Sequence, residues 1–177
     1  MVYYHSANSR LVSVASRPVS SPRWLAPSPG WFKINSDAAV DSSSKRVSFG
    51  VIIRDSCGQV MAALVEPFDL PVSVLVAEAM AIRRGIQFAV ELGFSSVGIE
   101  SDSSSLISLI INKDPPLSDV GLVVSDIIQL VSSLSISFIN FVPRSCNGVA
   151  HAITRFGLSI PDFFWFGLRI IPLVRRI

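Results

Sequence analysis

The stretch AEAMAIRRGIQFAVELGFSSVGIESD, from Ala77 to Asp102, places one carboxylate, Glu78, within an apolar helical pattern and another, Asp102, at the end of the hydrophobic strand that follows. At 100° per residue, Glu78 lies on the apolar face of a predicted helix. The other residues on that face are Val74, Ile82, Gly85 and Ala89. An ionised carboxylate on a core-facing surface needs a charge partner or a metal ion, because removing it from water alone costs several kcal/mol. We therefore expect Glu78 to meet Asp102 and an upstream acid, Asp37, around divalent metal.

The upstream acid is predicted to lie on a strand. In FKINSDAAV the side chains alternate, so that Lys33, Asn35 and Asp37 share the polar side. Two further strands, VSFGVIIRD and QVMAALVE, are separated by the turn sequence DSCG. These three strands are predicted to form an antiparallel meander.

The remaining elements alternate between helix and strand. They are predicted as a helix over about 73–92 ended by Gly93, a strand at 95–102, helices at 103–112 and about 118–133, a strand at 135–143, and a last helix that begins near Asn147, a residue suited to an N-cap. The order predicts an α/β fold with a mixed five-stranded sheet, in which three antiparallel strands precede two parallel crossovers and helices cover both faces. Sites in such sheets collect at the carboxyl ends of parallel strands, where Asp37 and Asp102 are expected to meet.

The chain divides into three parts by composition. Residues 1–30 are basic and rich in Ser and Pro, which predicts a linker, residues 31–158 form the predicted domain, and residues 159–177 form an apolar tail. The tail is too short for a membrane span, so we expect it to dock on the domain or on a protein partner. An organellar transit peptide is the weaker interpretation of the first segment, because its prolines interrupt an amphipathic helix.

The formal net charge of +2 is unevenly distributed. Between Trp31 and Leu158 there are nine Lys and Arg against twelve Asp and Glu, so the basic character belongs to the two ends. This distribution argues against a large positive face on the domain. The two cysteines are far apart and predict neither a zinc site nor a disulfide framework, which favours a reducing compartment, the nucleus or the cytoplasm.

Five motifs in order carry a family resemblance. WFKINSDAAV, FGVIIRDSCGQV, AEAMAIRRGIQFAVELGF, IESDS and FVPRSCNGVAHAI together resemble the ribonuclease H-like domain of plant non-LTR retrotransposons, a reverse-transcriptase-like domain. The resemblance covers the chain from Trp31 to about Leu158. It implies a metal-dependent endonuclease that hydrolyses the RNA strand of RNA–DNA hybrids, with two Mg²⁺ or Mn²⁺ ions held by Asp37, Glu78 and Asp102. Carboxylate oxygens are suitable ligands for such hard ions.

The chain departs from the family pattern at the fourth acid. His151 stands in that position, four residues after Asn147, and is expected to assist catalysis while holding the second ion more weakly than an acid would. The flexible loop that carries a His in the cellular enzymes is missing, and Ala38 replaces the usual glycine after the first acid, where its methyl group is expected to crowd a phosphate. Arg144 and Asn147, which precede the last helix, are candidate contacts to nucleic acid.

Simpler interpretations stay open for each residue. Asp37 alone suits a surface acid, Asp102 suits a helix cap, Glu78 suits an ion pair with arginine, and His151 suits a solvated helix residue. For the whole chain, the departures leave open a catalytically weak or inactive module that binds nucleic acid or protein, and the tail leaves open a role in assembly.

Overall fold

The computed structural model describes residues 22–133 and 136–167. Its elements in chain order are β1 (Phe32–Asp41), β2 (Arg46–Arg54), β3 (Val60–Asp69), α1 (Val74–Glu91), β4 (Val97–Ser101), α2 (Ser104–Asn112), α3 (Asp119–Ser133), β5 (Ile136–Phe141), the 3₁₀ turn η1 (Arg144–Cys146), α4 (Gly148–Gly157) and β6 (Phe164–Gly167). The strands form one mixed sheet in the order β5-β4-β1-β2-β3-β6. This is the α/β ribonuclease H-like arrangement predicted from the sequence, with one more strand than expected.

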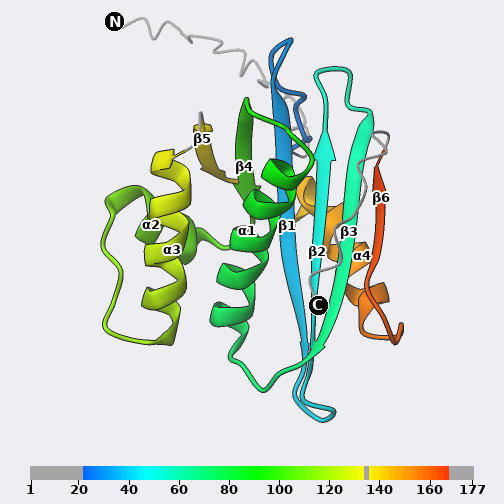
Figure 1. Ribbon diagram of the computed structural model, residues 1–177, viewed down its shortest axis with the longest axis vertical. Coiled ribbons are helices and arrows are strands. Elements are labelled where there is room, and N and C mark those ends of the chain that lie inside the picture. Colours follow the sequence, from blue (N-terminus) through cyan, green and yellow to red (C-terminus); the bar gives the residue numbers. More distant parts are fainter. Residues whose placement is uncertain (1–21, 134–135, 168–177) are drawn as a thin grey trace, which may run out of the picture.

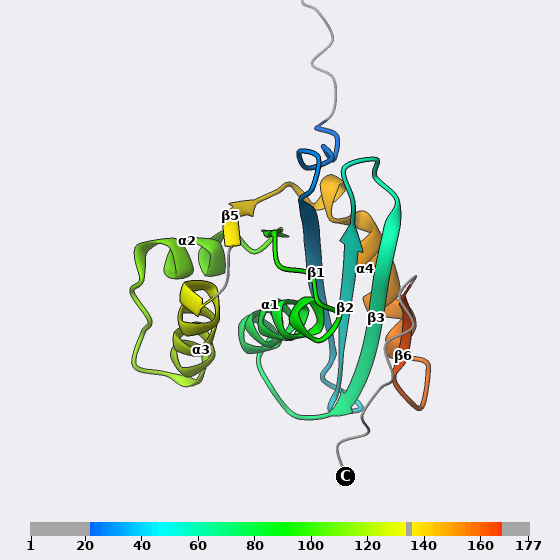
Figure 2. The same ribbon diagram turned by 45° about the horizontal axis from the view of Figure 1, so that its top comes forward.

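The sheet is covered by helices on both faces. Figure 1 shows α1 in front of β1 and β2 and α4 behind them, and the turned view in Figure 2 separates the two layers. Helices α2 and α3 lie beside α1, next to the edge strand β5. The predicted positions of the helices and of the antiparallel meander are thereby confirmed.

The apolar face of α1 packs on the meander. Ile82 and Ala89 are each 1% exposed, and Gly85 lies so close to β1 that an added Cβ would stand 3.0 Å from the Ile34 side chain. The prediction was wrong for Val74, which is 60% exposed. Val74 is the first residue of the helix, and the buried residues of α1 begin only at Ala77, about one turn later.

The parallel pairing between β1 and β4 is short, and its shortness creates the site. The paired residues run only from Phe32 to Asn35 on β1 and from Val97 to Glu100 on β4. Beyond Asn35, β1 continues beside β2 but has no paired residue on the β4 side in the described sheet. At this point the backbone of β1 is contacted from both helical layers: Asn147 donates to the Ser36 carbonyl, and the Ala38 amide donates to the Glu78 carboxyl.

The sixth strand corrects the predicted five-stranded sheet. Residues Phe164–Gly167, part of the predicted apolar tail, pair antiparallel with Ala62–Val65 of β3. Aromatic residues favour strands, but a run of four residues is too short for its alternation to be recognised. The rest of the tail, 168–177, and most of the predicted linker, 1–21, lie outside the described residues, so the predicted domain boundaries remain predictions. None of the described helices has the length and apolar character needed to cross a membrane.

Candidate metal site

Asp37 is a buried acid at the point where β1 loses its β4 neighbour. The residue is 1% exposed. Its Oδ2 accepts a hydrogen bond from Nδ1 of His151 at 2.8 Å and is 3.5 Å from Oγ1 of Thr154. Its Oδ1 is buried and has no hydrogen-bond partner among the described residues. The interpretation of Asp37 as a surface acid is therefore wrong.

Glu78 reaches the same point from α1 on the opposite face of the sheet. Burial raises the pKa of Glu78 to about 9, and the nearby carboxylates of Asp37 and Asp102 act in the same direction. The backbone amide of Ala38 donates to the Glu78 carboxyl and opposes this shift. Asp37 also lies within hydrogen-bonding reach of Glu78, and this contact raises the pKa of Glu78 further.

Asp102 follows the last residue of β4 and completes the group of acids. Its side chain is 8% exposed. Oδ1 accepts from Nδ2 of Asn147 at 2.8 Å, and Oδ2 accepts from a terminal nitrogen of Arg144 at 3.3 Å. The residue at the N-cap of α2 is Ser103, so the interpretation of Asp102 as that cap is not supported.

Asn147 connects Asp102 to β1. The residue is 1% exposed, and its Nδ2 also donates to the backbone carbonyl of Ser36 at 2.9 Å. Asn147 stands at the predicted N-cap of α4, but its side chain makes no capping hydrogen bond. The capping role expected from its residue type is absent: Nδ2 donates to Ser36 and Asp102, while the buried Oδ1, the atom that would accept a capping bond, has no hydrogen-bond partner among the described residues.

Helix α4 approaches the sheet closely because glycines face it. Gly50 pairs with Asp37 in the β1–β2 ladder, and a Cβ on Gly50 would lie 2.5 Å from Oγ1 of Thr154 and 2.9 Å from the carbonyl oxygen of Ala150. This contact brings His151, one helical turn before Thr154, to Asp37. His151 is 28% exposed in its side chain and bonded to a buried acid, so it is not simply a solvated helix residue.

The arginines of α1 form ion pairs with acids outside the candidate site. Arg83 pairs with Asp126 of α3 at 2.7 Å, and Arg84 pairs with Glu66 of β3 at 2.7 Å. Glu78 has a buried Oε2 without a hydrogen-bond partner in the described part of the chain. An ion pair with arginine therefore does not explain the burial of Glu78.

Ala38 does not crowd the site. Its methyl group packs against an apolar cluster formed by Val47, Phe49, Ala77 and Ala81. Strand alternation places this side chain on the face opposite to that of Asp37. The expectation that Ala38 hinders a phosphate is therefore not supported.

A second polar network extends from the site along the same face of β1. Lys33 forms an ion pair with Glu100 at 2.5 Å, and Glu100 also accepts from Asn35. Asn35 in turn accepts from Arg54, whose guanidinium lies 3.6 Å from the ring centroid of Trp24. The sequence interpretation missed this role of Glu100. Strand alternation could have indicated it, since Glu100 lies two residues before Asp102 and therefore on the same face. It also missed Thr154, which stands three residues after His151.

The acids provide the donor types that a hard divalent ion prefers. In the described residues, no group of three or more His, Cys, Asp and Glu side chains is already arranged to hold a metal ion. The buried oxygens Asp37 Oδ1 and Glu78 Oε2 nevertheless lack hydrogen-bond partners, and burial first, then the charges of Asp37 and Asp102, raise the pKa of Glu78. Carboxylate oxygens without donors fit Mg²⁺ or Mn²⁺.

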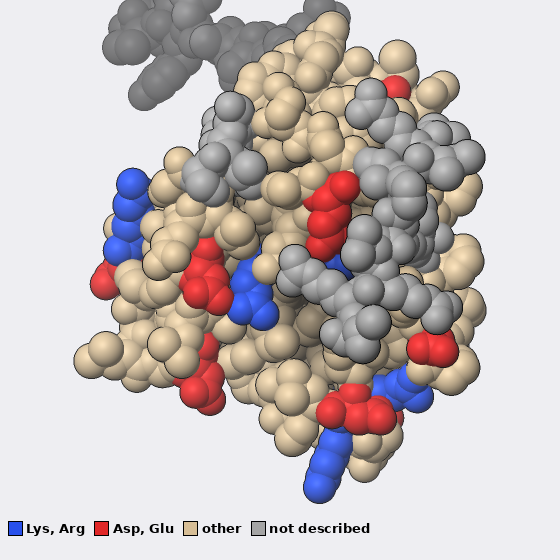
Figure 3. All heavy atoms as spheres, viewed as in Figure 1, with Lys and Arg blue, Asp and Glu red and all other residues tan. Residues whose placement is uncertain are grey.

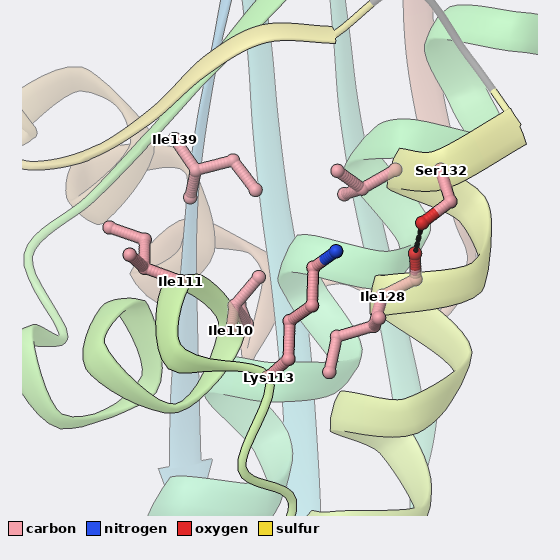
Figure 4. Close-up of a pocket in the computed structure, with 7 residues that line it drawn as sticks. Ile110, Ile111, Lys113, Ile128, Ser132 and Ile139 are labelled. Carbon is pink, nitrogen blue, oxygen red and sulfur yellow. Dashed lines mark hydrogen bonds between the residues drawn. The ribbon is translucent and has the colours of Figure 1, made fainter.

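The surface around the domain carries mixed charge. On the face seen in Figure 3, the described acidic and basic side chains are intermixed and separated by uncharged surface. A hollow of about 340 Å³ lies elsewhere, between α2, α3 and β5, and Lys113 reaches into its largely apolar lining (Figure 4). The candidate site residues do not line this hollow.

Comparison with known proteins defines the class of the fold. The ribonuclease H1 of the halophilic archaeon Halobacterium salinarum is 18% identical, with a TM-score of 0.67 over 73% of this chain and 98% of that chain. The N-terminal RNase H domain of Rv2228c from Mycobacterium tuberculosis is 19% identical, with a TM-score of 0.64 over 73% of this chain and 94% of that chain. LC11-RNase H1, isolated from compost by a metagenomic approach and solved with an RNA/DNA hybrid, is 15% identical, with a TM-score of 0.65 over 72% of this chain and 96% of that chain. The fold is therefore that of ribonuclease H.

The family follows from the sequence. The model of the reverse transcriptase-like family matches residues 35–157, which include every candidate site residue. The chain belongs to this family. No curated protein sequence matches the chain significantly.

Proposed function

We propose that this chain is a metal-dependent endonuclease that hydrolyses the RNA strand of RNA–DNA hybrids. The observation that carries the proposal is the convergence of Asp37, Glu78 and Asp102 from β1, α1 and the end of β4. Family membership and the ribonuclease H fold support it, as does the hybrid bound to LC11-RNase H1. Descent from a plant non-LTR retrotransposon and an intracellular location are part of the same proposal.

Each residue of the site has a proposed role. Asp37, Glu78 and Asp102 hold Mg²⁺ or Mn²⁺, and the two-ion arrangement implied by the resemblance remains a prediction. A bound divalent ion supplies the Lewis acidity that activates a water and stabilises the departing 3′ oxygen. His151 orients the Asp37 carboxylate and exchanges a proton with it.

The residues before α4 have separate roles. Arg144 is 63% exposed in its side chain, so it is available to a phosphate of the hybrid. Asn147 is buried, so we propose that it positions Asp102 in place of the expected contact with nucleic acid.

The proposal is tested with hybrids that carry a label on either strand. With Mg²⁺ or Mn²⁺, we expect shortening of the RNA strand alone, with 5′-phosphate and 3′-hydroxyl ends. An intact RNA strand at high protein concentration would contradict the proposal. His151→Asp, which places a carboxylate at the fourth position, is expected to increase the cleavage rate.

A binding module without useful turnover is the second candidate. It is favoured by the engagement of the Asp37 and Asp102 oxygens with His151, Asn147 and Arg144. A hybrid that binds with steep salt dependence but stays intact, even with His151→Asp, would support this candidate. Phe164 and Phe166 of β6 and the preceding Phe163 are exposed, and a protein contact at the tail remains part of this second candidate.

A further inference from the structure

A single guanidinium connects the two aspartates of the site. The terminal nitrogens of Arg144 lie 3.3 Å from Oδ2 of Asp102 and 2.9 and 3.0 Å from the two ring nitrogens of His151. The Nδ1 of the same ring is 2.8 Å from Asp37. The guanidinium therefore contacts Asp102 directly and is connected to Asp37 only through the His151 ring.

The position of this cation follows from the chain path. Arg144 begins η1, the turn between β5 and α4, while Asn147 three residues later is fixed between β1 and Asp102. The turn therefore directs Arg144 to the side of the acids that faces α4. Glu78 approaches from α1 on the other face of the sheet, so the guanidinium and the Glu78 carboxyl reach the acid group from different helical layers.

The charge of Arg144 opposes a second ion on the α4 side. A guanidinium stays protonated at every working pH, and a divalent ion held between Asp37 and His151 would be within a few ångströms of it. The same cation uses Oδ2 of Asp102, whose Oδ1 already accepts from Asn147. Since the arginine side chain is 63% exposed, its contacts are screened by water and are weak enough to exchange.

We propose that Arg144 takes the place of the second metal ion. The chain then binds one divalent ion among Asp37, Glu78 and Asp102, while the guanidinium, held by Asp102 and His151, supplies positive charge on the α4 side. This inference rests on the metal site of the proposed function. It differs from the proposed function in that the site binds one ion in place of two, and in that Arg144 excludes the second ion.

The experiment is a titration of the metal-free full chain with Mn²⁺, in which bound ion is measured by calorimetry and by the loss of the free-ion EPR signal. The parent is expected to bind one ion, and Asp37→Asn is expected to lose it. Arg144→Ala is expected to bind a second ion, or to bind the first roughly tenfold more tightly, because a nearby positive charge is removed. Arg144→Lys is expected to bind Mn²⁺ in a way intermediate between the parent and Arg144→Ala. Its ammonium keeps the positive charge but cannot contact Asp102 and His151 at the same time with two terminal nitrogens, as a guanidinium does.

The matched control is Arg83→Ala, which removes another surface arginine paired with an aspartate, Asp126. It is expected to bind Mn²⁺ like the parent. If the parent binds one ion that Asp37→Asn abolishes, yet Arg144→Ala leaves number and affinity unchanged, the inference is overturned and the metal site stands. Two ions of equal affinity in the parent overturn the inference in the same way. A parent that binds no Mn²⁺ overturns both the inference and the metal-dependent function.

Discussion

His151 on α4 lies with its Nδ1 2.8 Å from Oδ2 of Asp37 on β1, so the last helix of the domain is bonded directly to the first strand at the acid site. The approach of Glu78 from α1 on the other face makes Asp37 the meeting point of both helical layers. The early end of the β1–β4 pairing makes this meeting possible. Changes to either layer are therefore expected to act on the same carboxylate.

Replacement of Glu78 tests the raised pKa of this buried carboxyl in the metal-free protein. The folded chain holds a proton on Glu78 up to a pKa of about 9, whereas the unfolded chain releases it near 4.5. Between these values the folded state binds more protons, so its stability falls as pH rises from about 4.5 to 9. Glu78→Gln is expected to flatten this dependence and to exceed the parent in unfolding free energy by at least about 1 kcal/mol at pH 9.

The measurement is chemical denaturation at several pH values in the presence of a chelator. Glu91→Gln, on the exposed side of the same helix, is the control and is expected to keep the slope of the parent. An equal slope for Glu78→Gln and the parent would show that Glu78 is not protonated in the folded chain.

Removal of the Asn147 amide tests how Asp102 is held. The side chain is buried and donates to both Ser36 and Asp102, so Asn147→Ala leaves two acceptors without this partner. We expect a loss of about 1–3 kcal/mol in unfolding free energy, measured by urea denaturation. Asn112→Ala, at an exposed position, is expected to change stability by less than about 0.5 kcal/mol. Equal stability of the two variants would argue against a positioning role for Asn147.

An added methyl group at Gly50 tests the close approach of α4. The new Cβ would meet Oγ1 of Thr154 and the carbonyl of Ala150, so the helix must shift away from the sheet. Gly50→Ala is expected to lower the unfolding free energy by about 1–3 kcal/mol and to shift the NMR signals of the His151 ring. Gly148→Ala has no atom within 4 Å of its new Cβ and serves as the control. An unchanged His151 ring signal in Gly50→Ala would show that the close packing of α4 on the sheet does not position His151 at the site.

The sequence predicted the fold well because the fold follows from local patterns, and the same patterns led to the three acids that remain the predicted site. Alternation on β1 identified Asp37, and the helical period placed Glu78 toward the sheet. The family motifs added His151 as the residue in the fourth position, and the structure brings it to Asp37.

The features that the sequence did not predict depend on long-range contacts. The bond from Asn147 to Ser36 joins residues 111 positions apart, and no local pattern distinguishes this asparagine from a helix cap. Strand β6 was missed because its four residues acquire strand geometry only through pairing with β3. The link from Arg144 to Asp102 and His151 likewise depends on the turn between β5 and α4.

The most direct test of the central claim compares the parent with Asp37→Asn on a hybrid whose RNA strand is labelled. Asparagine keeps the size of the side chain but removes the charge that would hold the metal ion. With Mg²⁺ or Mn²⁺, the parent is expected to shorten the RNA strand and Asp37→Asn to leave it at the level of a reaction without protein. Equal cleavage by the two proteins, or an intact strand with both at high concentration, would contradict a nuclease centred on Asp37.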